Sequence, residues 1–123
     1  MALPVNRPFD EFVLSGRVAD VAATTAGWVT SPYKGKIKRA FSVVEGTTNG
    51  TATISFAIAG ATALTDTLVI ANGAVAGEVD SVEFSQQNSS AGLVAEGDKI
   101  SITSDGGGST TVVGNFYVVL ERA

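Results

Sequence analysis

The sequence contains no cysteine and no histidine. Without cysteine there is no disulfide, no cysteine-ligated zinc and no thiol nucleophile, so the fold must be stabilised by packing or by association. Without histidine the chain lacks the commonest general base and the commonest ligand of transition metals. Any hydrolytic chemistry would therefore have to use carboxylates, hydroxyls or lysine.

Charged residues are also scarce, and their balance is acidic. The 8 basic residues stand against 12 acidic ones, which gives a formal net charge of −4 at pH 7. Because binding to phosphates requires a footprint of lysine and arginine, this balance predicts no nucleic-acid partner. The one basic cluster consists of Lys34, Lys36, Lys38 and Arg39. It is interpreted either as a solvated strand face or as a patch for an acidic partner surface.

Long apolar runs are missing as well. No stretch approaches the roughly 20 apolar residues that span a bilayer. The N-terminus has neither the basic region nor the apolar segment of a signal peptide, and instead carries Pro4, Pro8, Asp10 and Glu11. We therefore expect no membrane partner and synthesis in a cytoplasm.

What the sequence does contain is a succession of short strand patterns. Residues 51–59 alternate strictly, with Ala52, Ile54, Phe56 and Ile58 on one side, which is typical of a half-buried strand. The dipeptide Asn49-Gly50 before it is a strong tight-turn signal. These two features predict a hairpin over residues 36–59. Similar patterns elsewhere bring the total to about eight strands with no long helix.

The fold class predicted from these patterns is all-β, a jelly-roll-like antiparallel β-sandwich of about eight short strands with an extended N-terminal arm. The same string of strands also fits an immunoglobulin-like sandwich, so the topology stays open. Residues 1–11 are assigned to the arm, because Pro4 and Pro8 fix φ and remove hydrogen-bond donors. Residues 12–123 are assigned to a single domain, which a chain of 123 residues can fill.

No spacing of residues predicts a catalytic site. Most carboxylates fall in turns, whereas glycoside hydrolysis needs two that converge on one bond. The run Gly106-Gly107-Gly108 lacks the Gly-Lys-Ser/Thr ending and the following helix of a phosphate loop. We therefore expect no enzymatic activity, no cofactor and no metal. A calcium ion on Asp105 and the glycine carbonyls is the alternative interpretation of this turn.

Two large aromatic residues, Trp28 and Tyr33, flank Pro32 near a predicted strand end. Such residues plug the ends of sandwiches, and they are also enriched at subunit contacts and on ligand platforms. We assign Trp28, Pro32 and Tyr33 to a subunit interface, with the other two roles as alternatives.

The last strand pattern, residues 112–120, is apolar on both faces. Alternation directs one set of residues into the sandwich and the other set away from it. The inward set is Val112, Phe116, Val118 and Leu120, and the outward set is Val113, Tyr117 and Val119. The outward set needs a cover, so we expect Tyr117 to contact another subunit or the folded-back arm.

Taken in order, these features resemble the small β-sandwich decoration (cement) and head-fibre proteins of tailed bacteriophages. The resemblance covers roughly residues 28–120. It lies in the strand end at Trp28 to Tyr33, the strand and turn from Lys36 to Gly50, and the segments Glu96-Gly97-Asp98-Lys99-Ile100-Ser101-Ile102 and Ser104-Asp105-Gly106-Gly107. The proline-bearing arm before Trp28 is similar in character only.

The resemblance implies a structural protein on the outer surface of the virion. Such a protein is assembled in the host cytoplasm, is often trimeric, and clamps neighbouring subunits of the major capsid protein. Its arm would add a strand to the capsid, which requires an extended segment and no special side chains. The residues assigned to this arm contact are Ala2, Leu3, Pro4, Val5, Pro8, Phe9 and Phe12. The alternative is a receptor- or carbohydrate-binding module of a phage tail fibre.

Overall fold

The computed structural model describes residues 11–61, 63–85 and 90–122 of the chain. These residues form strands and one turn of 3-10 helix, Ser90–Gly92. The strands are β1 (Glu11–Val18), β2 (Ala26–Thr30), β3 (Gly35–Val44), β4 (Ala52–Ile58), β5 (Leu68–Ile70), β6 (Val79–Glu83), β7 (Leu93–Val94), β8 (Lys99–Ser104) and β9 (Gly114–Arg122). The prediction of an all-β sandwich is confirmed. Nothing helical in these ranges has the length and hydropathy that a membrane crossing requires.

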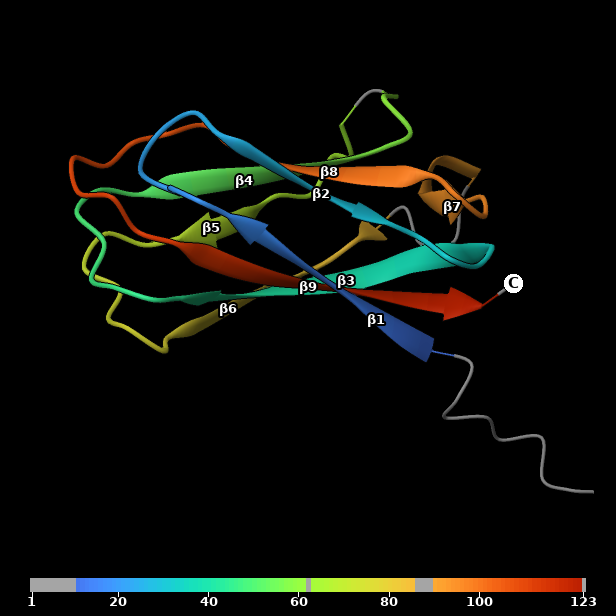
Figure 1. Ribbon diagram of the computed structural model, residues 1–123, viewed down its shortest axis with the longest axis horizontal. Helices are drawn as coiled ribbons and strands as arrows, with labels where there is room; N and C mark the ends of the chain where they lie inside the picture. Colours follow the sequence, from blue (N-terminus) through green and yellow to red (C-terminus); the bar gives the residue numbers. More distant parts are fainter. Residues whose placement is uncertain (1–10, 62, 86–89, 123) are drawn as a thin grey trace, which may run out of the picture.

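The strands form two antiparallel sheets that lie one above the other (Figure 1). Sheet A has the order β1-β9-β3-β6, with the short β7 also paired to β3, and sheet B has the order β2-β8-β4-β5. Most connections cross from one sheet to the other, which is the interleaved order of a jelly roll. An immunoglobulin-like sandwich would pair several successive strands within one sheet. The structure therefore settles the topology that the sequence left open.

The predicted hairpin over residues 36–59 is wrong, because β3 belongs to sheet A and β4 to sheet B. The turn itself is present, and Gly50 has the positive φ of 122° that the Asn-Gly signal indicates. At Gly50 the chain passes so close to the loop between β8 and β9 that an added Cβ would lie 1.8 Å from the carbonyl oxygen of Gly107. Only glycine fits there, and the turn carries the chain across the sandwich.

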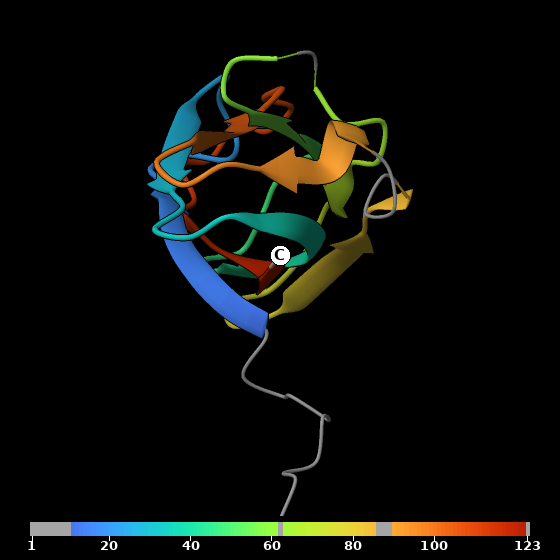
Figure 2. The same cartoon turned by 90° about the vertical axis from the view of Figure 1, so that its right-hand side faces the viewer.

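The core lies between the two sheets and is centred on three phenylalanines. Phe56 of β4 makes edge-to-face contacts with Phe84, which follows β6, and with Phe116 of β9, at ring-centroid distances of 5.3 and 6.4 Å. All three side chains are fully buried. Seen along its long axis, the sandwich is closed on one side where β1 and β2 lie next to each other (Figure 2).

The inward alternation predicted for two strands is confirmed. In β4 the buried residues are Ala52, Ile54, Phe56 and Ile58. At the C-terminal end the buried residues are Val112, Phe116, Val118 and Leu120. Val119, predicted to point outward, is nevertheless only 6% exposed. Its neighbours in the register are Val13 of β1 and the long side chain of Arg39 of β3, between which it lies.

A β-bulge at Lys38 changes the faces of β3. Ile37 pairs with Leu120 and Arg39 with the next residue of β9, Val119, so Lys38 is an extra residue in β3. As a result Ile37 is buried in the core, whereas Phe41 lies on the outer face of sheet A. The sequence pattern, read without a bulge, places both on one face.

Two buried polar atoms lie unpaired between β3 and the edge strand β6. Ser42 of β3 faces Asp80 of β6 in the register, and the Ser42 Oγ and one Asp80 carboxylate oxygen, Oδ2, are buried without a hydrogen-bond partner. Desolvation raises the pKa of Asp80, and the negative charge of Glu78 raises it further. Folding therefore makes the charged form of Asp80 less favourable than it is in the unfolded chain.

The variant Asp80→Asn should raise the stability of the protein at neutral pH. The folded state binds a proton at Asp80 more readily than the unfolded chain, whose aspartate pKa is about 3.9. The cost of the Asp80 charge to folding stability therefore grows as the pH rises from the unfolded pKa through the folded pKa. Thermal unfolding at pH 4 and pH 7 should show a larger gain from the substitution at pH 7. Glu78→Gln, which removes only the repelling charge, should give a smaller gain. An Asp80→Asn effect that is independent of pH would contradict this account.

Candidate functional site

The outer face of sheet A carries a band of apolar side chains, here called the sheet A face. Its members are Val13, Phe41, Val43, Val79 and Tyr117. Val13 and Val79 are each 58% exposed and Tyr117 is 38% exposed, while Phe41 and Val43 are half-buried. The prediction that Tyr117 points out of its own chain is therefore consistent with its exposure; the contact that would cover it stays a prediction.

The strand register makes this band continuous. Tyr117 of β9 lies between Ser15 of β1 and Phe41 of β3, and Val43 of β3 lies beside Val79 of β6. Side chains directly opposite each other in antiparallel strands share a face and touch. The apolar residues therefore follow a diagonal path from Tyr117 through Phe41 and Val43 to Val79 at the β6 edge. At the β1 edge Val13 lies one row away, opposite the nearly buried Val119, and the polar Ser15 is the direct β1 neighbour of Tyr117.

A groove of about 360 Å³ lies beside Tyr117 within this face. It is lined by Tyr117 and Asn115 of β9 and by Ser15, Gly16 and Arg17 of β1. Tyr117 is the only aromatic residue among these five, so the groove has one apolar wall and an otherwise polar or small lining.

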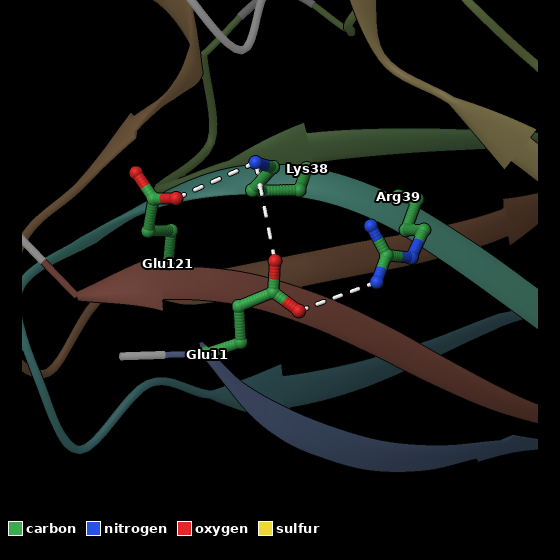
Figure 3. A network of polar contacts seen from close by, with 4 residues as sticks. All are labelled: Glu11, Lys38, Arg39 and Glu121. Carbon is green, nitrogen blue, oxygen red and sulfur yellow. Dashed lines mark hydrogen bonds and ion pairs between the residues drawn. The ribbon is translucent and has the colours of Figure 1, made fainter. Parts of the chain in front are cut away.

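A network of charges borders the sheet A face at the end where β1 begins (Figure 3). The carboxylate of Glu11 contacts Lys38 Nζ at 3.9 Å and the Arg39 guanidinium at 3.2 Å, and Glu121 contacts Lys38 Nζ at 3.4 Å. The bulge in β3 allows both Lys38 and Arg39 to reach Glu11. Half of the basic cluster seen in the sequence is thus neutralised within its own chain, and each half-exposed pair contributes only about 0 to 1 kcal/mol.

Phe12 and Tyr33 come together at the same end of the molecule. Their rings meet edge to face at 5.5 Å, and the guanidinium of Arg122 lies 4.4 Å from the centre of the Tyr33 ring. Phe12, which was assigned to the arm contact with the capsid, is part of β1, pairs with Leu120 and packs against the core. Glu11, the last residue of the predicted arm, also belongs to β1. The strand begins earlier because β9 is long enough to pair with both residues.

The other residues predicted to contact a capsid through the arm are Ala2, Leu3, Pro4, Val5, Pro8 and Phe9. They lie outside the described residues.

Trp28 lies on the other side of the sandwich from Tyr117. It projects from β2 on the outer face of sheet B and is 62% exposed, so it does not plug the end of the sandwich. Pro32 and Tyr33 are also exposed, but Tyr33 contacts Phe12 and Arg122 at the end of sheet A. Tyr33 therefore packs at the start of β1, whereas Trp28 lies on the outer face of sheet B.

A second groove, of about 470 Å³, lies beside Trp28. It is here called the Trp28 groove, and its lining residues are Trp28, Ala59, Gly60, Gly97, Asp98, Lys99 and Ser101. Sequence reasoning singled out Trp28 but missed the rest of the lining. The available signal was the run of small residues on the outer side of β4 and β8, such as Ala57 and Ser101, which leaves room next to a large ring.

The backbone of this groove is strained at one position. Ala59 has a φ of 54°, the only positive φ of a non-glycine residue in the part of the chain that the structure describes. Gly60 follows with a φ of 77°. The Ala59 N–H donates to the carbonyl oxygen of Lys99 at 2.7 Å, which holds this conformation in place. Non-glycine residues adopt left-handed φ at a cost of about 1 to 2 kcal/mol.

The carboxylates do not converge on a metal site. No group of three Asp or Glu side chains among residues 11–61, 63–85 and 90–122 is placed to hold an ion. Asp105 accepts a hydrogen bond from the backbone N–H of Thr53 at 2.9 Å. This contact links the loop after β8 to β4, which gives Asp105 a structural role in its turn.

Comparison with known proteins adds information on the fold. No protein-family model matches the sequence, and no curated protein matches it. Among solved structures, the carbohydrate-binding module CsCBM6-3 from Clostridium stercorarium, solved with cellobiose, has a TM-score of 0.55 at 15% identity over 87% of this chain and 74% of its own. CBM35 from Cellvibrio japonicus Abf62 has a TM-score of 0.50 at 13% identity over 92% and 98%.

A chain in the capsid asymmetric unit of cyanophage Pam1 is similar over the whole length. Its TM-score is 0.52 at 19% identity, and the match covers 100% of this chain and 93% of that one. At these identities the likeness is one of fold. The chain therefore shares its jelly roll with sugar-binding modules and with a chain of similar length in a phage capsid.

The strain at Ala59 predicts a measurable gain from glycine. Ala59→Gly should raise the free energy of unfolding by up to about 1 kcal/mol, because glycine adopts this φ without a steric penalty. Ala57→Gly, in the regular strand β4, is the matched control and should lower it by about 0.5 to 1 kcal/mol. Urea denaturation of both variants measures the difference. A loss of stability in Ala59→Gly would contradict the assignment of strain.

Proposed function

We propose that this protein is a structural component of a phage virion. In this proposal it decorates the outer surface of the capsid and docks on the major capsid protein through the sheet A face. The observation that carries the proposal is the exposed apolar band from Val13 to Val79, centred on Tyr117. Monomeric proteins seldom leave a large continuous apolar patch facing water, and such patches mark interaction sites.

The composition of the face fits a protein partner. Its centre is apolar and contains an aromatic residue beside a groove, and its border carries the charges of Glu11, Lys38, Arg39 and Glu121. An apolar centre with a charged rim is the usual anatomy of a protein interface. The network around Glu11 is already paired, so docking on a protein surface would not strand an isolated charge there.

The comparisons support a capsid as that partner without deciding it. The match to the cyanophage capsid chain covers this chain completely and nearly all of that one, so the shared fold extends over all of the given sequence. The low charged fraction of 16% also suits a chain whose surface is partly covered in an assembly.

We further propose that residues 1–10 extend the contact and that the protein is a homotrimer that clamps neighbouring capsid subunits. Residue 10 is bonded to Glu11, so this segment starts at the charged end of the sheet A face. Strand addition by an arm uses backbone hydrogen bonds and requires little of its side chains. Light scattering of the purified protein measures the oligomeric state directly.

A second candidate function is supported by a different surface. The Trp28 groove, with an exposed tryptophan beside a cavity, favours a carbohydrate-binding module of the kind found on phage fibres. The two functions use opposite sides of the sandwich and do not exclude each other.

The variant Tyr117→Asp should weaken binding to capsids assembled without this protein. A buried aromatic anchor at the centre of an interface is worth about 2 kcal/mol or more, so the affinity should fall about 30-fold. Thermal unfolding of the free protein should change little, because Tyr117 is exposed there. Co-sedimentation with capsids at increasing protein concentration measures the affinity.

Two controls define the surface. Trp28→Ala removes a more exposed aromatic residue from sheet B and should leave capsid binding unchanged. A chain without residues 2–10 keeps β1 intact and should bind more weakly than the full chain if the arm contributes. Wild-type affinity for capsids in Tyr117→Asp would refute docking through the sheet A face. Wild-type affinity in the chain without residues 2–10 would refute a contribution of the arm to capsid binding.

A further inference from the structure

We infer that the Trp28 groove binds a neutral sugar, with one face of a pyranose ring stacked on the indole of Trp28. The inference starts from a row of side chains across the outer face of sheet B. In the register, Ser101 of β8 lies between Trp28 of β2 and Ala57 of β4. One very large side chain therefore stands next to two very small ones, and the short side chains leave open space against the flat ring.

The end of the groove is built by backbone. The chain leaves β4 through Ala59 and Gly60, both with positive φ, and the Ala59 N–H is tied to Lys99 of β8. A strained residue persists only where its surroundings fix it, and such residues are concentrated at binding sites. The hydrogen bond from Ala59 to Lys99 holds this turn in one conformation, so this end of the groove is formed before any ligand arrives.

The polar groups of the groove match the hydroxyls of a sugar. Asp98, Lys99 and Ser101 line one side of the groove. Asp98 Oδ2 accepts a hydrogen bond from the Ala95 N–H at 2.8 Å, and the Ser101 hydroxyl donates to the Ala57 carbonyl oxygen at 3.4 Å. The second Asp98 oxygen and the Ser101 oxygen are left as acceptors, and the Lys99 ammonium group is a donor. Together they offer both donors and acceptors, as alternating sugar hydroxyls require. The C–H face of a pyranose is apolar enough to cover the Trp28 ring, which is otherwise 62% exposed.

The charge of the lining selects among ligands. One carboxylate and one ammonium group cancel, so the groove provides no net field for a polyanion. The acidic net charge of −4 further disfavours a nucleotide or a sulfated glycan. A neutral hexose or N-acetylhexosamine unit fits a lining whose positive and negative charges cancel.

The position of the groove has one consequence that depends on the proposed docking of sheet A on a capsid. Sheet A and sheet B are opposite layers of the sandwich (Figure 2). If the sheet A face docks on a capsid, the Trp28 groove points away from the particle. A decorated virion would then display one sugar site on each copy of this chain. Sugar binding itself requires no capsid.

The chain provides its own reporter, because Trp28 is its only tryptophan. The emission of the purified full-length protein is followed while neutral oligosaccharides of glucose, galactose, mannose and N-acetylglucosamine are added. We expect a saturable change in intensity or wavelength with at least one of them. The absence of any saturable change up to about 10 mM would overturn the inference, since weaker binding would carry no function at this site.

Two variants test the groove with the best oligosaccharide found. Ser101→Phe fills the groove and leaves Trp28 in place, so binding should weaken at least tenfold by fluorescence titration. Trp28→Ala removes the platform, and calorimetry should detect at least a tenfold loss. Both positions lie on the outer face of sheet B, so both variants should fold, which thermal unfolding checks. Wild-type affinity in either folded variant would overturn the assignment of the site.

Tyr117→Asp is the matched control on the opposite face. It should bind the oligosaccharide as the wild type does, and Ser101→Phe should bind capsids as the wild type does. Sugar binding without capsid binding by the wild type would refute the proposed function and leave this inference intact. Capsid binding without sugar binding would refute the sugar site and leave the proposed function intact.

Discussion

The packing of Phe56 against Phe84 and Phe116 fixes the distance between the two sheets, and the rest of the structure depends on that distance. Most connections of the jelly roll cross from one sheet to the other, so each crossing loop must span the same gap. The close approach of Gly50 and Gly107 shows how little room the crossing loops have. With no cysteine in the chain, this apolar layer carries the stabilisation that a disulfide would otherwise share.

Because the core fills the inner side of both sheets, the outer sides are free to differ. The outer side of sheet A carries large apolar residues. Val13 of β1 and Tyr117 of β9 lie in adjacent strands, and the nearly buried Val119 lies opposite Val13. The outer side of sheet B has small residues such as Ala57 and Ser101 next to a single Trp28. The first surface is suited to broad contact with a protein, and the second to a small ligand. This difference between the two outer faces underlies both proposals.

Sequence periodicity predicted much of the fold, because alternation reports directly which residues of a strand face the core. It succeeded for β4 and for the inward residues of β9. It failed for residues 36–59, since a turn signal fixes local φ angles but not which sheet the next strand joins. It also failed after Ile37, because the bulge at Lys38 moves Phe41 and Val43 to the outer face of sheet A. Trp28 and Tyr33 are close in sequence, yet β2 carries one outward and the loop after it carries the other to Phe12.

The central claim concerns which side of the sandwich faces the capsid, and an electron cryo-microscopy map of decorated particles tests it most directly. The account predicts that the outer side of sheet A, with Tyr117 at its centre, lies against the capsid protein. It also predicts that Trp28 lies on the surface that faces solvent. A map in which sheet B covers the capsid and Tyr117 faces solvent would contradict the account.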